Sequence, residues 1–394
     1  MKIVLFNSFY YPHIGGGAEI VFKEQAEGLQ KRGYDVVVVT THGVDFIKKE
    51  VIDGVRVIRI PYCNLYWGFE AKNKPSYKKI QWHLKDIYNY SIKKYVDKIL
   101  DNEKPNIAIC HNLSGLSISV WDSLKERHIK IIQEIHDQYM TCINSNSFNN
   151  NKFCENPCKV CKTFRLLHRI KSANIDSVIG VSKFVLDRFI SLGYYKNAKK
   201  FVLHNARSFP TVEHRPWSND TPLRIGFIGN VSRVKGVDIL VKAFIKSKID
   251  ATLTIAGMAT DKPFLEELES YKKDNNSIKI VGYMNSQEFY RQIDIIVIPS
   301  VWPDTFPTVA FEACANNVPV ICSRIGGLPE IIKQDTNGLL FTPGSIDELT
   351  TILNNITQDK LNKWKTNARN SVKEMTDPEG MFNKLENILK ETFE

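Results

Sequence analysis

The stretch Ile295–Pro329, IIVIPSVWPDTFPTVAFEACANNVPVICSRIGGLP, decides the fold predicted for this chain. Residues 295–299 form a continuous apolar run, as expected of a strand buried on both faces. Two prolines interrupt it, and the second, Pro307, favours the start of a helix. A second apolar strand over residues 318–322 leads into a glycine pair. Strand, loop, helix and strand in this order indicate one βαβ segment of a Rossmann-like α/β domain.

Two acidic residues flank the start of the predicted helix. Asp304 lies in the loop before it, and Glu312 lies about a turn and a half into it. The free N–H groups of a helix N-terminus attract phosphate, whereas a carboxylate further along suits a ribose diol. The sequence therefore predicts a site for a nucleotide that carries a sugar. An ordinary helix cap with a solvated acid is the alternative.

This pattern resembles the group-1 retaining glycosyltransferases, glycosyltransferase family 4. Their signature is two acidic residues separated by seven others, which Asp304 and Glu312 match, although Asp304 stands where the family more often has glutamate. The resemblance implies an α/β chain with the GT-B fold, that is, two Rossmann-like domains whose parallel sheets face a central cleft. It also implies a nucleotide-diphosphate sugar as donor and no cofactor required for catalysis.

The N-terminus repeats the strand-turn-helix pattern. A strand over residues 2–6 is followed by Gly15-Gly16-Gly17 and a helix from Ala18. Glycines permit close approach of the backbone to a ligand, but such a run alone is often only a tight turn. The resemblance places Gly16 and Gly17 at the phosphate or sugar of the donor.

Two predicted strands of the first half end in histidines. Residues 106–110 lead to His111, and residues 129–135 lead to His136 and Asp137. Ligand sites of α/β sheets lie at the carboxyl ends of the strands, although a lone histidine there is more often part of the core. In the family, a histidine at the position of His136 contacts the transferred sugar. We therefore assign His136 to the site, with His111 and Asp137 on the acceptor or sugar side.

The second half opens with the strand 223–228, a glycine turn and a helix from Val237. Lys235 is placed to bind a diphosphate over that turn. Asn230 stands where the family usually has arginine, so Arg233 is a candidate substitute. The resemblance gives the catalytic set His136, Asp304 and Glu312 and the donor-binding set Gly16, Gly17, Arg233, Lys235, Tyr283, Phe306, Pro307, Thr308, Val309 and Glu312.

Four of the eight cysteines lie within about twenty residues of one another: Cys142, Cys154, Cys158 and Cys161. Four thiols suit tetrahedral zinc, but the spacing is irregular. Because disulfides are not the default in a cytosolic chain, a structural zinc site and free thiols are the two alternatives.

The sequence predicts an N-terminal acceptor domain (1–206), a linker (207–222), a C-terminal nucleotide-sugar domain (223–376) and a tail helix (377–394) that returns to the first domain. Residues 1–208 contain 32 Lys and Arg against 19 Asp and Glu, and residues 209–394 contain 21 against 24. A basic first half indicates an anionic partner. We see no nucleic-acid-binding motif, so an anionic membrane surface is the better candidate.

Residues 71–101 are basic and amphipathic, with Ile80, Leu84 and Ile87 on one helical stripe and Trp82 off it. Packing of that stripe on the sheet is favoured over contact with a membrane. No apolar run is long enough to span a bilayer, and the start is too short for a signal peptide. We expect a cytoplasmic protein, with peripheral contact at the inner face of the membrane as a further hypothesis.

The predicted function is retaining, hexosyltransferase-type transfer of a sugar from a nucleotide-diphosphate sugar to a saccharide or lipid-linked saccharide. The predicted context is synthesis of a bacterial surface polysaccharide. The alternatives are a nucleotide-sugar epimerase or a glycogen-type synthase on the same fold, and a non-catalytic nucleotide-sugar or polysaccharide-binding protein.

Overall fold

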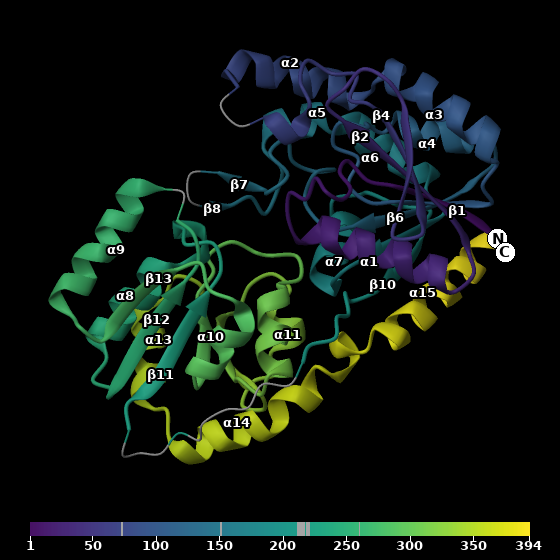
Figure 1. The fold of residues 1–394 in the computed structure, drawn as a ribbon. Helices are drawn as coiled ribbons and strands as arrows, with labels where there is room; N and C mark the ends of the chain where they lie inside the picture. The colour runs from purple at the N-terminus through teal and green to yellow at the C-terminus, as the bar shows by residue number, and fades with distance from the viewer. Residues whose placement is uncertain (72–73, 150–151, 211–216, 218–220, 260) are drawn as a thin grey trace. The chain divides into compact units, whose positions relative to one another are not determined.

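The computed structural model of the chain describes residues 1–71, 74–149, 152–210, 217, 221–259 and 261–394. The chain divides into two compact units. The first comprises Met1–Ser147, Cys154–Asn205 and Glu379–Glu394, and the second comprises Phe148–Phe153 and Ala206–Pro378. Both are α/β (Figure 1). Of the predicted linker, residues 211–216 and 218–220 lie outside the described residues.

The described part of the first unit contains a sheet of eight strands. Neighbouring strands are parallel, except that β3 is antiparallel to β4. The sequence analysis did not predict this added edge strand. In spatial order the strands are β10 (Lys199–Val202), β9 (Ser177–Gly180), β6 (Lys130–Ile135), β5 (Ile107–Cys110), β1 (Lys2–Phe6), β2 (Asp35–His42), β4 (Val55–Pro61) and β3 (Lys48–Ile52).

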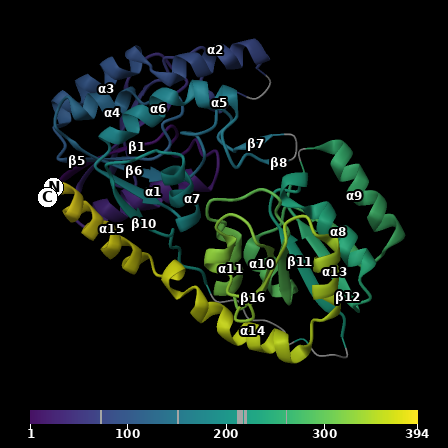
Figure 2. The ribbon, with the colours of Figure 1, turned by 180° about the vertical axis from the view of Figure 1, so that it is seen from behind.

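Helices cover both faces of this sheet, with α1, α7 and α15 on one and α3 and α4 on the other; Figure 2 shows the arrangement from behind. Apolar side chains of α1 and α15 pack on alternate residues of β1, as the period of two in a strand requires. The helices are α1 (Gly17–Lys31), α2 (Ser76–Ile87), α3 (Tyr90–Glu103), α4 (Ser119–Lys125), α5 (Lys159–Phe164), α6 (Leu166–Lys171), α7 (Lys183–Ser191) and α15 (Pro378–Phe393), with 3-10 turns η1 (Gly68–Glu70) and η2 (Ser172–Asn174).

The C-terminal helix α15 is part of the first unit. Phe382, Leu385 and Leu389 join its core, and Arg32 of α1 forms ion pairs with Glu379 and Glu386. The side chains of α15 therefore complete the apolar layer over α1.

The basic segment 71–101 differs from the prediction. It forms two helices, because Asn89 caps the start of α3 by accepting hydrogen bonds from the amides of Ser91 and Ile92. On α2 the stripe is reversed: Trp82 is buried, whereas Ile80 and Leu84 are each 54% exposed. The indole of Trp82 is held in the interior by a hydrogen bond to the carbonyl of Tyr66.

The described part of the second unit contains a six-stranded parallel sheet. Its strands, in spatial order, are β13 (Ile278–Gly282), β12 (Ala251–Ala256), β11 (Leu223–Ile228), β14 (Ile295–Ile298), β15 (Val320–Ser323) and β16 (Gly338–Phe341). The helices are η3 (Arg233–Lys235), α8 (Val237–Lys246), α9 (Lys262–Asp274), α10 (Ser286–Gln292), α11 (Thr308–Ala315), α12 (Leu328–Ile331), α13 (Ile346–Asn354), α14 (Gln358–Ser371) and η4 (Lys373–Thr376). A short hairpin, β7 (Phe148–Asn149) and β8 (Lys152–Phe153), lies within the predicted cysteine loop.

Two backbone features fix the stretch 295–329. Asn317 ends α11 in the left-handed conformation, with φ of 54°. Gly326 has φ of 62°, and a Cβ there would lie 2.3 Å from the carbonyl oxygen of Asp304. Only glycine lets the turn after β15 approach the loop before α11 this closely. In the described part of the chain, no helix combines the length and apolar character needed to cross a membrane.

Candidate functional site

The predicted residues fall into two groups, one in each unit. In the first unit, β5 and β6 are adjacent and parallel, with Cys110 opposite Gln133. His111 follows the end of β5, and His136 and Asp137 follow the end of β6. The register therefore brings residues that are 25 positions apart in the chain to the same edge of the sheet.

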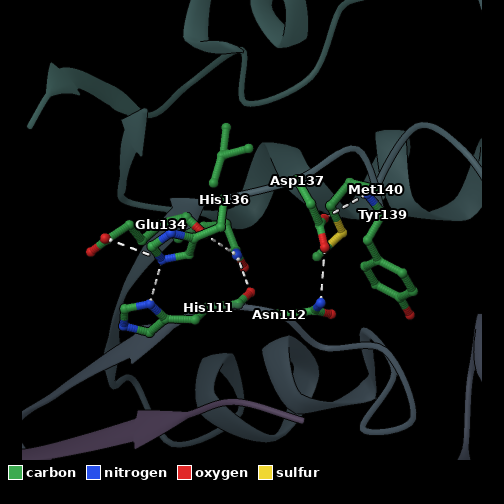
Figure 3. A pocket seen from close by; sticks show the side chains of 9 residues that line it. His111, Asn112, Glu134, His136, Asp137, Tyr139 and Met140 are labelled. Atoms are coloured by element: carbon green, nitrogen blue, oxygen red, sulfur yellow. Dashed lines mark hydrogen bonds and ion pairs between the residues drawn. The ribbon is translucent and has the colours of Figure 1, made fainter. Parts of the chain in front are cut away.

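The two histidines are in direct contact (Figure 3). His111 Nδ1 lies 2.8 Å from His136 Nε2, and the rings stack with centroids 5.0 Å apart. Glu134 Oε1 lies 3.2 Å from the same His136 nitrogen, and Gln25 Nε2 donates to the other Glu134 oxygen at 2.9 Å. These contacts form a chain of polar side chains from Gln25 through Glu134 and His136 to His111, in which the single nitrogen Nε2 of His136 faces both Glu134 and His111.

Burial sets the charges in this chain. Burial by itself would raise the pKa of Glu134, but the two histidines and Gln25 lower it to about 2. Burial also lowers the pKa of His111 to about 3. At neutral pH the Glu134 carboxylate is therefore ionised and the His111 imidazole is neutral.

Glu134 and Gln25 were missed by the sequence analysis. A glutamate between Gln133 and Ile135, just before the end of a predicted central strand, is an available signal, since glutamate is almost never fully buried unless paired.

Asp137 is held by two hydrogen bonds. Its carboxylate accepts from the backbone amide of Tyr139 at 2.7 Å and from the Asn112 side chain at 2.9 Å. Burial raises the pKa of Asp137 to about 6. A small pocket of about 10 Å³, room for about one water molecule, lies among His111, His136 and Asp137 (Figure 3).

Gly16 is the N-cap of α1, which begins at Gly17, one residue before the predicted start at Ala18, and the predicted binding of an anion at this turn has a competitor. Glu19 is buried and accepts a hydrogen bond from the Gly16 amide at 2.7 Å. This is the reciprocal half of a capping box. A donor phosphate at this turn would have to replace the Glu19 carboxylate or bind beside it.

In the second unit, Lys235 and Asp304 form an ion pair between Nζ and Oδ2. The Lys235 ammonium also lies over the ring of Trp302, 5.0 Å from its centroid. Lys235 ends η3, and the following Gly236 has φ of 70° with no room for a Cβ beside the carbonyl oxygen of Pro299. The glycine turn after β11 and the loop after β14 thus place a cation and an acid together.

The predicted residues Phe306, Pro307, Thr308 and Val309 form the entry to α11. Pro307 is the N-cap, and no side chain caps the first turn. Phe306 is buried against Phe311, with ring centroids 5.5 Å apart, whereas Thr308 and Val309 are half-buried. The helix therefore begins with backbone N–H groups that can receive an anion.

Glu312 lies further along α11. Its Oε1 accepts a hydrogen bond from the Ser286 hydroxyl at 2.8 Å. Burial raises the pKa of Glu312, an effect that Ser286 and the nearby charge of Arg207 partly offset. Asn285 is the N-cap of α10, which leaves the hydroxyl of Ser286 available for Glu312.

Arg233 and Tyr283, two further predicted donor-binding residues, differ in how accessible their side chains are. The Arg233 guanidinium pairs with Glu267 at 2.6 Å and lies over the ring of Phe264, so a diphosphate would have to displace these contacts. Tyr283 is 79% exposed after β13, so its ring is accessible for stacking.

The four clustered cysteines are free thiols. The hydrogen bond from the Cys161 thiol, together with backbone amides that include Asn144 and Ser147, lowers the pKa of Cys142 to about 5. Burial raises the pKa of Cys154.

Among the described residues, the one group of three or more potential metal ligands with all ligand atoms within 4.8 Å of one another is His111, Glu134 and His136. In this group, His136 Nε2 already contacts both His111 and Glu134. The Cys161 thiol interacts with the thiols of both Cys142 and Cys158, and the zinc site stays a prediction.

Two family models match the chain. "Glycosyltransferase Family 4" matches residues 15–207, and "Glycosyl transferases group 1" matches residues 211–371. A Klebsiella pneumoniae relative, described as a 42.6 kDa protein in the cps region, is 30% identical over 333 residues, 84% of this chain and 88% of its own. A Methanocaldococcus jannaschii glycosyltransferase, MJ1607, is 27% identical over 89% of this chain and 87% of its own.

Solved structures agree on the fold. Sucrose-phosphate synthase from Thermosynechococcus elongatus has a TM-score of 0.73 at 18% identity, covering 100% of this chain and 99% of that one. Anabaena HepE in complex with UDP has a TM-score of 0.70 at 18% identity, covering 99% and 100%. The fold is that of the GT-B glycosyltransferases. Within that class, the chain belongs to the group-1 glycosyltransferases of family 4 type.

Proposed function

We propose that this protein is a retaining glycosyltransferase that moves a hexosyl group from a nucleotide-diphosphate sugar to a saccharide or lipid-linked saccharide acceptor. The observation that carries the proposal is the arrangement around α11. Lys235 and Asp304 meet before its uncapped N-terminus, and Glu312 is held four residues into the helix.

Each part of this arrangement suits one part of a donor. Lys235 and the first amides of α11 would bind the diphosphate and stabilise the charge that develops on it as the sugar leaves. Asp304 would orient sugar hydroxyls. Glu312, fixed by Ser286, would accept hydrogen bonds from the ribose diol. HepE, which shares the fold, has been solved with UDP and with UDP-glucose, and this favours testing UDP-sugars first.

The acceptor side rests on the first unit and on the relatives. His136 is fixed in orientation by Glu134 and His111, as a residue that positions the transferred sugar should be. The Klebsiella pneumoniae relative lies in a cps region, which favours a role in polysaccharide synthesis.

Retention of configuration is the finer part of the proposal. We assign no side chain as the protein nucleophile, so we infer that the acceptor attacks from the face that the diphosphate leaves, with a phosphate oxygen taking its proton. The anomeric configuration of the product, measured by NMR, tests this directly.

Donor binding is tested by thermal shift of the full chain with UDP-, GDP- and ADP-sugars, because a ligand specific for the folded state raises the melting temperature. We compare wild type with Glu312→Gln, and with Glu288→Gln as an exposed control in the same unit. Loss of a hydrogen bond to a charged group costs about 1.5–3 kcal/mol, so the Glu312 variant should bind about tenfold more weakly or worse.

The outcomes separate the alternatives. A shift with one nucleotide class that Glu312→Gln weakens and Glu288→Gln preserves supports the donor site. Conversion of the free nucleotide sugar into an epimer would indicate an epimerase. Binding without turnover on any saccharide acceptor would indicate a non-catalytic protein, and no shift with any donor would refute the donor site.

A further inference from the structure

Helix α2 is turned so that its buried face carries a carboxylate. The buried residues of α2 are Trp82 and Asp86, whereas Ile80 and Leu84 are each 54% exposed. Burial of apolar side chains ordinarily decides which face of a helix packs on the core, and an aspartate is almost never fully buried unless it is paired. The orientation of α2 breaks both rules, and departures of this kind are expected where a site requires them.

The Asp86 carboxylate joins two loops that are distant in the chain. Its Oδ1 accepts a hydrogen bond from the Gly115 amide at 2.6 Å, and its Oδ2 accepts one from the Tyr139 hydroxyl at 2.8 Å. Gly115 belongs to the loop that follows His111, and Tyr139 belongs to the loop that follows His136. One side chain of α2 therefore holds the loops that follow both of the strands ending in a histidine.

These bonds complete a ring of hydrogen bonds around Asp137. The Asp137 carboxylate accepts from the Tyr139 amide and from the Asn112 side chain (Figure 3). The Asn112 side-chain oxygen in turn accepts from the amide of Ser114 at 2.9 Å. The next amide donates to Asp86, and Asp86 closes the ring by accepting from the Tyr139 hydroxyl. Asp86 is the member of this ring that comes from neither loop.

The backbone at Gly115 is shaped for this contact. Its φ of 86° lies in the left-handed region that favours glycine, and this conformation directs its amide to Asp86. A Cβ on Gly115 would lie 3.8 Å from the ring of Trp82. Both buried residues of α2 therefore lie against the same turn.

The buried charge of Asp86 does not stabilise the fold. Burial raises the pKa of Asp86 to about 6, although the charge of Arg165 and the hydrogen bonds from Tyr139 and Gly115 oppose this rise. The carboxyl group is therefore mostly ionised at neutral pH and can accept both bonds. Because a raised pKa in an acid means that ionisation lowers the free energy of unfolding, a role in the site explains this carboxylate better than stability does.

We propose that Asp86 is a positioning residue of the acceptor side, which fixes the loops after β5 and β6 and so sets the orientation of Asp137 and His136. It acts through the Tyr139 hydroxyl and the Gly115 amide. The proposal rests on the glycosyltransferase function proposed above and adds a residue to its machinery. It also gives a reason for the outward-facing apolar stripe of α2, since the two hydrogen bonds of Asp86 orient the helix.

The test removes the hydrogen bonds of Asp86 in steps. Tyr139→Phe removes one donor, and Asp86→Ala removes both acceptor oxygens. Asp86→Asn keeps the size of the side chain, one acceptor for the Gly115 amide and a donor for the Tyr139 oxygen. The matched controls are Tyr88→Phe and Asp122→Ala, because the Tyr88 hydroxyl donates to Asp122 at 2.6 Å in the same unit but outside the ring.

Two measurements are made on each variant that folds. The first is kcat and KM for release of nucleotide from the sugar donor that gives a thermal shift, with water as the acceptor and UDP-glucose tried first. The second is the NMR signal of the His136 ring in protein with labelled histidine, assigned with His136→Gln.

We expect Asp86→Ala and Tyr139→Phe each to lower kcat about tenfold while KM changes less than about threefold, since the donor residues of the second unit are intact. Asp86→Asn should restore kcat to within about threefold of wild type. The His136 signal should shift in the first two variants and stay in place in Asp86→Asn and in both controls.

A loss of stability with no change in kcat or in the His136 signal would overturn the proposal, and so would equal losses of kcat in the two controls. If Asp86→Ala does not fold, Tyr139→Phe decides. If no nucleotide sugar gives a thermal shift, the donor site has failed, and the His136 signal still shows whether Asp86 positions that ring.

Discussion

The buried chain from Gln25 to His111 predicts a specific effect of Glu134→Gln. The pKa of Glu134 falls from 4.5 to about 2 in the folded protein. At about 1.4 kcal/mol per pKa unit this corresponds to at most about 3 kcal/mol of stability, and to less at neutral pH, where His111 is neutral and no longer contributes a charge. The glutamine side chain keeps one acceptor oxygen for Gln25 or His136, so we expect the free energy of unfolding of the variant to fall by about 2 kcal/mol.

The dependence on pH follows from the direction of the change in pKa. A carboxyl group with a lowered pKa stabilises the folded state fully above its unfolded value of 4.5, and this stabilisation is lost as the pH falls toward about 2. The stability difference between wild type and Glu134→Gln should therefore be constant from pH 7 to about 5 and shrink below that. Denaturant unfolding at several pH values measures it.

Glu391→Gln is the matched control, because Glu391 is an exposed residue of the same unit. It should leave the stability unchanged at every pH. If Glu134→Gln is as stable as wild type at pH 7, or if its deficit does not change below pH 4.5, the charged chain is not formed as described. Since the same carboxylate orients His136, kcat/KM for sugar transfer should also fall about tenfold.

Two further predictions concern the thiols and the packing of α15. If the cysteine loop holds zinc, the purified protein should contain zinc in stoichiometric amount. Cys142→Ser should remove the zinc, whereas the control Cys63→Ser should not. Absence of zinc from protein prepared without a chelator would contradict the site. Gly28→Ala should destabilise the protein by about 1–3 kcal/mol, because the added Cβ would lie 1.9 Å from the ring of Phe382. Gly17→Ala, with nothing within 4 Å, is the control, and equal melting temperatures would show that α15 does not pack closely on α1.

Local sequence features determined the elements of the second unit that position Asp304 and Glu312. The apolar run of β14, Pro307 at the start of α11 and Asn317 at its end act on their own backbone, so their effect is visible in the sequence. The spacing of Asp304 and Glu312 relative to that helix follows from the same local rules.

The helices after residue 71 show where local rules were insufficient. Asn89 has the chemistry of a helix cap, yet the sequence alone gives no reason to break the helix there. The position of Trp82 in the interior depends on the carbonyl of Tyr66, which is supplied by a different segment. Tertiary contacts thus decided which face of α2 is exposed.

By itself, the sequence determined the α/β class, the two histidines at strand ends and the acidic pair on either side of the start of α11, because each depends on residues close together in the chain. Only the tertiary structure placed Gln25 on Glu134, His111 on His136, and Ser286 on Glu312. The physical reason is that strand order and helix packing set which distant residues meet, and burial then sets their charge.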